Sequence, residues 1–278
     1  MLDIRTYSEG LCKKDGIYFS KKIKKSVISY PEEGHNRCLK IEDNSFWFRH
    51  RNSCIILGIK RYYANKIIFD VGGGNGFVSK ALQDENITSV LVEPGIQGCL
   101  NARKRNISVI ICSSLQDAGF KFNSIPAIGM FDVLEHIEND IQYCKDLHDV
   151  LIKDGLFFLT VPTYRFLWSD ADVSAGHFRR YTKKDLVSKL NSVGFKVEYA
   201  TYFFSILPIA IFLFRTIPYK FVKNRQSGNI GHRNNEHNTR KGLLGKILNR
   251  IWKMELSKFQ KGKTILFGAS LFIVAKKV

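Results

Sequence analysis

The sequence lacks a C-x-x-C pair, a signal-peptide apolar run at its N-terminus and any long uninterrupted hydrophobic segment. Its six cysteines are scattered: Cys12, Cys38, Cys54, Cys99, Cys112 and Cys144. These absences predict free thiols in a reducing, cytoplasmic compartment rather than a disulfide framework. We predict no metal. The most apolar stretch, Phe203 to Phe214, contains Pro208 and is shorter than the roughly 20 residues that a transmembrane helix needs.

Acidic residues are also scarce. The chain has 43 Lys or Arg against 25 Asp or Glu, a formal net charge of +18. Between Arg215 and Lys263, thirteen basic residues face only Glu236 and Glu255, which gives 13 − 2 = +11. Such clustering favours an anionic partner: phospholipid head groups, a phosphorylated substrate or nucleic acid.

With 278 residues, of which 45% are hydrophobic, the chain can form one large domain with additions. From Lys66 onward, apolar runs alternate with helical patterns, and the runs span residues 66–71, 88–92, 107–111, 127–133, 156–161, 196–203 and part of 264–275. Continuous apolar strands joined by helices are typical of a parallel sheet buried on both faces, so we predict an α/β, doubly wound, Rossmann-like fold. One helix should begin near Ile141 and end at Asp154. Another should be capped by Thr182 and end before Gly194.

Four segments follow from this pattern: an N-terminal arm and lid (1–65), the core (66–204), a basic and apolar insertion (205–263) and the last core strand (264–278). The first forty residues, rich in lysine (Lys13, Lys14, Lys21, Lys22, Lys24 and Lys25), show no periodicity and are expected to be irregular or helical. In the insertion, Leu244, Ile247, Leu248, Ile251, Trp252 and Phe259 share one helical face. This basic amphipathic helix could lie on an anionic membrane surface or pack on its own domain.

The strongest local signal is the glycine-rich turn from Asp70 to Gly76, between a strand and a helix. Glycines let the backbone approach a ligand closely, and the following helix offers unpaired N–H groups. Asp70 beside this turn suits a cationic ligand better than a pyrophosphate. Glu93 closes the next strand, where a carboxylate can accept both ribose hydroxyls of a nucleoside.

Taken in order, four motifs resemble those of class I S-adenosylmethionine (SAM)-dependent methyltransferases, especially the small-molecule subgroup with ubiquinone-type enzymes. They are D-V-G-G-G-N-G at 70–76, V-L-V-E-P at 90–94, F-D-V-L-E-H-I at 131–137 and D-G-L-F-F-L-T-V-P at 154–162. The resemblance covers residues 66–203 and implies a seven-stranded sheet with an antiparallel last strand.

The resemblance also implies a set of SAM-binding residues. Those bordering the methionine part would be Asp70, Gly72, Gly73, Gly74 and Gly76, with Asp132 after the fourth strand. Glu93 and Pro94 would hold the ribose. Ser114 and Leu115 stand where the family contacts adenine, although the usual acidic residue is absent there.

Two further segments resemble methyltransferases associated with bacterial surface-glycan synthesis: F-W-F-R-H-R-N at 46–52, and L-W-S at 167–169 with G-H-F-R-R-Y-T at 176–182. The first would form a lid, with Arg51 facing the SAM carboxylate. The acceptor site would be lined by Trp47, Trp168, Arg179, Arg180 and Tyr181. Arg179 and Arg180 could bind an anionic acceptor or pair with acidic residues of the protein.

Methyl transfer from a sulfonium is an in-line displacement, which needs a base only if the acceptor must lose a proton. His136 and His177 are the candidates, although each could have a purely structural role. We expect a cytoplasmic enzyme, peripheral at the inner face of the membrane, acting on a small-molecule, glycan or lipid-linked acceptor. The alternatives are an RNA methyltransferase that holds phosphates with the basic insertion, which lacks a recognisable RNA-binding module, and a non-catalytic SAM-binding protein. The oligomeric state is left open.

Overall fold

The computed structural model describes residues 2–21, 32–63, 67–221 and 243–278. The expectations for Lys22, Lys24 and Lys25 therefore lie outside the described residues. The same holds for the part of the basic insertion between 222 and 242.

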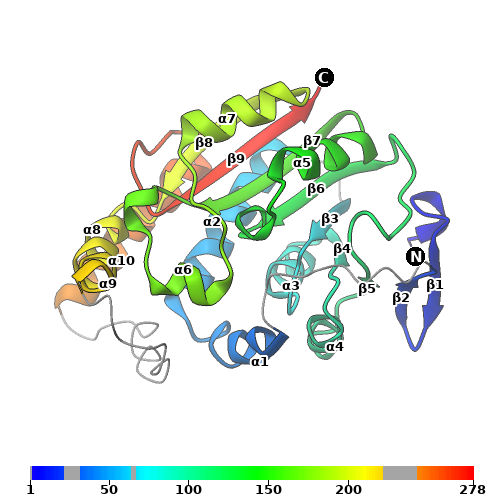
Figure 1. The fold of residues 1–278 in the computed structure, drawn as a ribbon, viewed down its shortest axis with the longest axis horizontal. Coiled ribbons are helices and arrows are strands. Elements are labelled where there is room, and N and C mark those ends of the chain that lie inside the picture. The colour runs from blue at the N-terminus through cyan, green and yellow to red at the C-terminus, as the bar shows by residue number, and fades with distance from the viewer. Residues whose placement is uncertain (1, 22–31, 64–66, 222–242) are drawn as a thin grey trace.

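Seven strands form the predicted core sheet. They are β3 (Ile67–Val71), β4 (Thr88–Val92), β5 (Val109–Cys112), β6 (Ile125–Phe131), β7 (Leu151–Pro162), β8 (Phe195–Phe203) and β9 (Ser270–Lys277). Their order is β5-β4-β3-β6-β7-β9-β8, and β9 runs antiparallel to both β7 and β8. The prediction of a Rossmann-like sheet with an antiparallel last strand is confirmed (Figure 1).

The sheet nevertheless has nine strands, because an N-terminal hairpin extends it. β1 (Leu11–Lys14) pairs antiparallel with β2 (Ile17–Ser20), and β2 pairs parallel with β5. The expectation of an irregular or helical arm was therefore wrong for this segment. Asp15 and Gly16 both have positive φ, at 48° and 83°. Asp-Gly is a strong hairpin-turn signal, so the sequence did carry the information.

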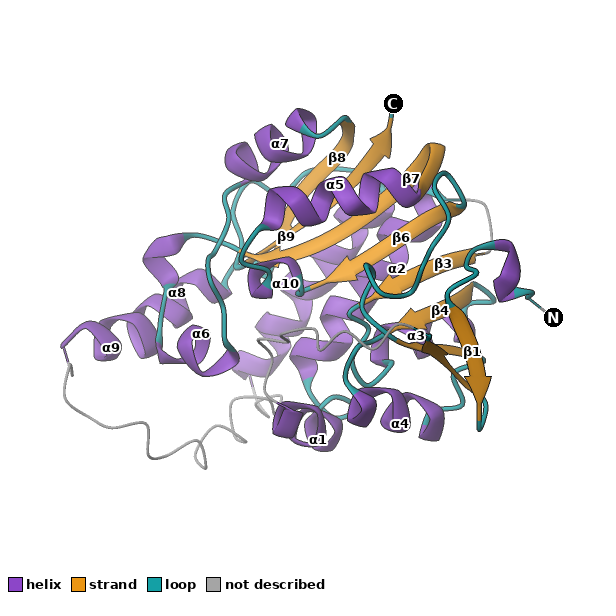
Figure 2. Ribbon diagram, turned by 45° about the vertical axis from the view of Figure 1, so that its right-hand side comes forward, coloured by secondary structure: helices purple, strands orange, loops and turns teal. Residues whose placement is uncertain are grey.

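Helices cover both faces of the sheet. Those of the core are α2 (Phe46–Tyr62), α3 (Phe77–Asp84), α4 (Ile96–Lys104), α5 (Asp140–Val150) and α7 (Lys183–Ser192). α5 and α7 lie on one face and α2 on the other (Figure 2). Shorter elements are η1 (Ile4–Thr6), α1 (Glu32–Ile41), η2 (Leu134–His136), η3 (Arg165–Leu167) and α6 (Asp170–Ala175).

The helix boundaries agree with the sequence in one place and differ in another. The Thr182 hydroxyl accepts a hydrogen bond from the Asp185 N–H at 3.2 Å, as expected of an N-cap. The helix α5 was expected to end at Asp154 but ends at Val150, and β7 begins at the next residue. The extra strand residues Leu151 to Gly155 turn at Asp154, which has a positive φ of 61°.

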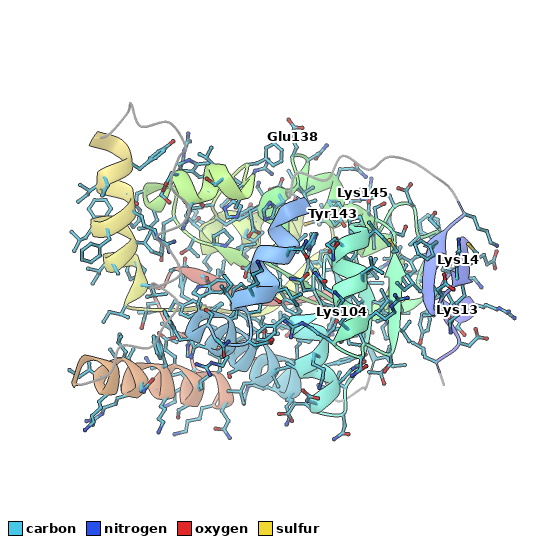
Figure 3. The ribbon with its side chains drawn as sticks, turned by 90° about the horizontal axis from the view of Figure 1, so that it is seen from below. Lys13, Lys14, Lys104, Glu138, Tyr143 and Lys145 are labelled. Carbon is cyan, nitrogen blue, oxygen red and sulfur yellow. The ribbon has the colours of Figure 1, made fainter. Side chains whose placement is uncertain are left out.

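The insertion folds as α8 (Leu207–Ile211), η4 (Phe212–Thr216), α9 (Ile217–Phe221) and α10 (Leu243–Gln260). α10 packs on α2 of its own domain. Trp252 stacks on Phe46 with ring centroids 4.8 Å apart, and the buried Glu255 meets His50 at 2.8 Å. Figure 3 shows α8–α9 and α10 at the end of the molecule opposite the hairpin that carries Lys13 and Lys14. In the described part of the chain, no helix is both long and apolar enough to cross a membrane.

Candidate active site

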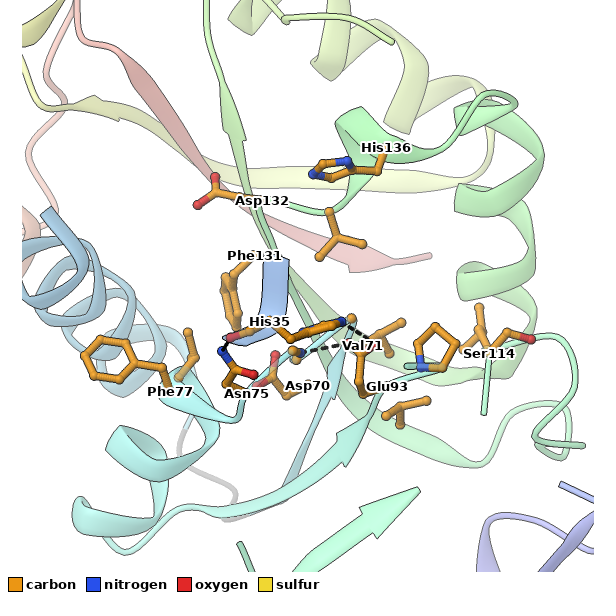
Figure 4. Close-up of a pocket in the computed structure, with 18 of the residues that line it drawn as sticks. His35, Asp70, Val71, Asn75, Phe77, Glu93, Ser114, Phe131, Asp132 and His136 are labelled. Atoms are coloured by element: carbon orange, nitrogen blue, oxygen red, sulfur yellow. Dashed lines mark hydrogen bonds and ion pairs between the residues drawn. The ribbon is translucent and has the colours of Figure 1, made fainter. Parts of the chain in front are cut away.

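A cavity of about 290 Å³ opens at the carboxyl ends of β3, β4 and β6, the edge where open α/β sheets bind ligands. Its volume is at the low end of the roughly 300–1,000 Å³ that small-molecule pockets occupy. In Figure 4, Asp132 and His136 lie on one side of this cavity, and Asp70 and Glu93 on the other.

The glycine-rich turn forms the floor of the cavity. Gly72 has a φ of +72°, and a Cβ there would meet the Val133 side chain at 2.7 Å, so only glycine fits. The Gly72 N–H donates to the Val92 carbonyl at 2.8 Å, which ties the turn to β4. A Cβ at Gly74 would meet nothing within 4 Å, because there the backbone faces open space. Gly76 is the N-cap residue of α3, and it does not line the cavity.

Glu93 is buried and anchored by backbone. Its two carboxylate oxygens accept hydrogen bonds from the N–H groups of Gly74 (2.9 Å) and Gly95 (2.7 Å). Burial raises the pKa of Glu93 to about 7, although these two bonds lower it. The carboxylate also lies 3.8 Å from Nε2 of His35, a residue of α1. A ribose would meet a fixed acceptor, since each carboxylate oxygen can accept more than one hydrogen bond.

Asp70 lies deeper, at the end of β3. Ser79 donates to its carboxylate at 2.7 Å, and Ser89 donates in turn to Ser79 at 2.8 Å. Burial raises the pKa of Asp70 to about 6, against the hydrogen bond from Ser79 and the charge of Arg51. The buried carboxylate would be stabilised by a positive ligand charge.

Arg51 and Asp132 form an ion pair across the cavity wall. Thr160 also donates to Asp132, at 3.1 Å, while Asp132 keeps a positive φ of 56°. A left-handed backbone conformation is strained for a residue other than glycine, and such strained residues are found most often at functional sites. The Arg51 guanidinium also lies 5.1 Å from the ring centroid of Trp47, and its buried Nε has no partner among the described residues.

His136, His177 and Glu135 converge beside the cavity. The two imidazole centroids are 4.7 Å apart and nearly perpendicular, and Nε2 of His177 is 4.0 Å from the Glu135 carboxylate. Burial, together with the charge of His177, lowers the pKa of His136 to about 4. One donor atom from each residue lies within 4.8 Å of the others, a spacing that a divalent cation could bridge. The sequence analysis did not foresee this grouping.

His177 is held by a carboxylate that the sequence analysis missed. Asp172, in α6, accepts from Nδ1 of His177 at 2.9 Å and from two guanidinium nitrogens of Arg180 at 2.7 and 3.1 Å. Burial alone would raise the pKa of Asp172, but these hydrogen bonds hold it at about 2. The Asp172 carboxylate also caps α6 by accepting from the Ser169 N–H at 2.9 Å.

The structure places the other predicted residues in two groups. Those that line the cavity are Arg51, Asp70, Gly72, Gly73, Gly74, Glu93, Pro94, Ser114, Leu115, Asp132 and His136. Those outside its lining are Gly76, Trp47, Trp168, His177, Arg179, Arg180 and Tyr181. Tyr181 is fully buried and donates to Asp140 at 2.9 Å, and Arg179 pairs with the same carboxylate at 2.9 Å.

The cavity also includes residues that the sequence analysis did not single out. They come from α1 (His35 and Cys38), from the residue after it (Glu42), from the glycine-rich turn (Asn75) and from α5 (Tyr143). Asn75 donates to the His35 carbonyl at 2.8 Å and so joins α1 to the turn. The helical sequence of α1 carries no motif, so only its position in the fold reveals these contacts.

Comparisons with known proteins agree with this geometry. A family model described as a methyltransferase domain matches residues 47–200. The chain is 21% identical over 173 residues to a probable S-adenosylmethionine-dependent methyltransferase of Mycolicibacterium smegmatis, covering 60% of this chain and 66% of that protein. It is 24% identical over 153 residues to sphingolipid C9-methyltransferase 2 of Gibberella zeae, covering 48% and 29%. Both matches span less than two thirds of the relative's own length.

Among solved structures, the fold is similar to that of Haemonchus contortus phosphoethanolamine N-methyltransferase 2 in complex with SAM. The TM-score is 0.56 at 14% identity, over 94% of this chain and 61% of that one. At this identity the likeness shows a shared fold.

Proposed function

Since a methyltransferase-domain model matches more than half of its length, the chain belongs to that family, and we propose that it transfers the methyl group of SAM to an acceptor hydroxyl or similar group. The acceptor is a small-molecule, glycan or lipid-linked precursor. The observation that carries the proposal is the cavity, which joins the buried Glu93 carboxylate, a glycine-rich turn and an Arg51–Asp132 pair at one sheet edge.

The cavity fits the chemical features of SAM. Glu93 would accept the ribose hydroxyls, while Ser114 and Leu115 would border the adenine. The open space over Gly74 leaves room for the methionine part beside the buried Asp70 carboxylate, which favours a nearby sulfonium. Arg51, whose Nε is buried without a partner in the described part of the chain, would meet the SAM carboxylate.

On the acceptor side, His136 lines the cavity and His177 packs against His136, with ring centroids 4.7 Å apart. The acceptor oxygen forms a bond to the methyl carbon while the carbon–sulfur bond breaks, and S-adenosylhomocysteine leaves. We assign the acceptor's proton to His177, because Asp172 binds its Nδ1 and leaves Nε2 as a proton acceptor. His136 stays neutral, since its pKa is about 4.

Arg179 and Arg180 differ in how much of each guanidinium is left for an anionic group on the acceptor. Arg180 is engaged by Asp172 and by the Thr163 carbonyl at 3.2 Å. Arg179 keeps 27% of its side chain exposed, so it is the better candidate for an acidic group on the acceptor.

Calorimetry with SAM tests the cofactor assignment. We expect the unmodified protein to bind SAM, and Glu93→Gln to bind it roughly 30-fold more weakly, because it loses charge-assisted hydrogen bonds of about 2 kcal/mol. Labelled SAM with fractionated lipid, glycan and RNA pools then identifies the acceptor class. Absence of SAM binding by the unmodified protein would eliminate the proposal, and transfer to RNA alone would replace the acceptor class.

A further inference from the structure

The helical segment formed by α8, η4 and α9 projects from one end of the molecule (Figures 1 and 2). This segment carries several exposed apolar side chains. Ile209, Phe212 and Leu213 follow the i, i+3, i+4 spacing that places residues on one helix face. Their side chains are exposed rather than packed: Ile209 is 60% exposed, Leu213 is 49% exposed, and the neighbouring Phe214 is 77% exposed.

Two loops extend this surface. Phe166, in η3, meets Phe212 with ring centroids 6.1 Å apart, and Tyr164 stacks on both Phe166 (5.4 Å) and Phe267 (5.1 Å). Leu266, next to Phe267, is 85% exposed. We define the apolar patch by its exposed members: Phe166, Ile209, Phe212, Leu213, Phe214, Leu266 and Phe267. Several large apolar side chains exposed in one region of a soluble protein are typical of an interaction site.

In the part of the chain from Phe203 onward, which supplies six of the seven patch residues, the charge is one-sided. From Phe203 to Val278 the sequence has only two carboxylate side chains. Glu236 lies outside the described residues, and Glu255 is buried against α2. Exposed basic residues flank the patch, with Arg165 next to Phe166, and Lys261 and Lys263 just before Leu266. More basic residues stand on the solvent side of α10: Lys246, Arg250, Lys253 and Lys258.

This combination selects the partner. Nucleic acid or an acidic protein would complement the basic residues but would leave the leucines and phenylalanines in water. A bilayer with anionic lipids complements both, because Lys and Arg near its surface are attracted to the anionic head groups and apolar side chains bury in the headgroup boundary.

We propose that the apolar patch inserts into the surface of an anionic lipid bilayer, with Arg165, Lys261 and Lys263 on the lipid phosphates. η3 directly follows β7, and the same loop region carries His177, so the docked protein would present its acceptor side to the lipid. That last point, but not the docking itself, rests on the proposed methyl transfer.

Co-sedimentation with vesicles tests the docking. We expect the full chain to bind vesicles that contain phosphatidylglycerol and to bind pure phosphatidylcholine vesicles much more weakly. Binding to the phosphatidylglycerol vesicles should decrease at high salt. The triple variant Leu213→Ser, Phe214→Ser, Leu266→Ser should lose at least tenfold in vesicle affinity. Phe122→Ser is the matched control, since Phe122 is 76% exposed outside the apolar patch, and it should bind as the unmodified protein does.

Two results would overturn the inference: no binding of the unmodified protein to anionic vesicles, or equal binding by the triple variant. A dimer in sedimentation velocity that the triple variant abolishes, without vesicle binding, would instead assign the apolar patch to a second copy. SAM calorimetry on the same variants separates this test from the proposed function, because the substituted side chains lie outside the cavity and SAM affinity should not change.

Discussion

At the scale of single residues, Asp172 combines several polar contacts with a fully buried side chain. Its carboxylate, with none of its side chain exposed, caps α6, binds Arg180 through two nitrogens and orients His177. A buried carboxylate paired in this way stays ionised, so it can stabilise a positive charge that forms on the His177 ring. Asp172 is therefore a positioning residue for the proposed proton acceptor.

Asp172→Asn tests this role. We expect the methyl-transfer rate to fall roughly 100-fold on an acceptor fraction that supports turnover, because the amide cannot stabilise the imidazolium. SAM affinity by calorimetry should stay within about twofold, since Asp172 does not line the cavity.

Excess EDTA should leave the rate of the unmodified protein unchanged. Activity that is lost in EDTA and restored by a divalent cation would transfer the role of His177 from base to metal ligand. A parallel loss of SAM binding in Asp172→Asn would mean that the residue has only a structural role.

The meeting of the glycine-rich turn with Glu93 was predictable from sequence, because short motifs fix both of them locally. β3 and β4 are adjacent parallel strands, so the turn after β3 and the carboxylate after β4 meet at one sheet edge. There the Gly74 N–H donates to the Glu93 carboxylate at 2.9 Å. Asp172 could not be found this way. Its partners His177 and Arg180 follow it by only five and eight positions, but no motif distinguishes its carboxylate from that of the nearby Asp170.

At the scale of elements, the contact between α2 and α10 joins the insertion to the core. Glu255 accepts from His50 at 2.8 Å, from the Phe204 N–H at 3.0 Å and from the Ser205 N–H at 2.7 Å. Burial alone would raise the pKa of Glu255, but the hydrogen bonds from His50 and Ser205 hold it below its ordinary value of 4.5. Its contribution to stability is thus present above pH 4.5 and is lost as the pH falls below it.

Replacing Glu255 by Gln should destabilise the protein by about 3 kcal/mol in urea unfolding, because it removes the charge that satisfies several buried donors. Glu198→Gln is the matched control. Glu198 is exposed and pairs with the exposed Lys196 at 3.2 Å, so its loss should change stability by less than about 0.5 kcal/mol. Similar losses in both variants would contradict the assignment of Glu255 as the anchor of α10.

This contact also explains what the sequence could not predict about the elements. The amphipathic pattern of α10 predicted a helix with one apolar face but left its partner open, since His50 and Glu255 are 205 positions apart. The parallel strands were predictable, because burial on both faces produces continuous apolar runs such as β7. The hairpin β1–β2 was missed because its strands are short, and Lys13 and Lys14 are exposed on the outer one.

For the whole molecule, the two buried carboxylates of the cavity couple folding to pH. The pKa of Asp70 is raised to about 6 and that of Glu93 to about 7, in both cases mainly by burial. The folded state therefore binds more protons than the unfolded state from roughly pH 4 to 7. The contribution of these two groups to stability falls as the pH rises through that window.

SAM should respond in the opposite direction, because its sulfonium and ribose hydroxyls favour the ionised carboxylates. One pH unit below its pKa, Glu93 is ionised in roughly one molecule in eleven, so SAM should bind roughly tenfold more weakly at pH 6 than at pH 8. At a fixed SAM concentration well above Kd, this difference gives about 1.4 kcal/mol more stabilisation at pH 8. Thermal unfolding with and without SAM at both pH values measures it. Glu93→Gln should lose most of the difference, and an equal SAM-induced shift at both pH values in the unmodified protein would show that Glu93 does not titrate against the cofactor.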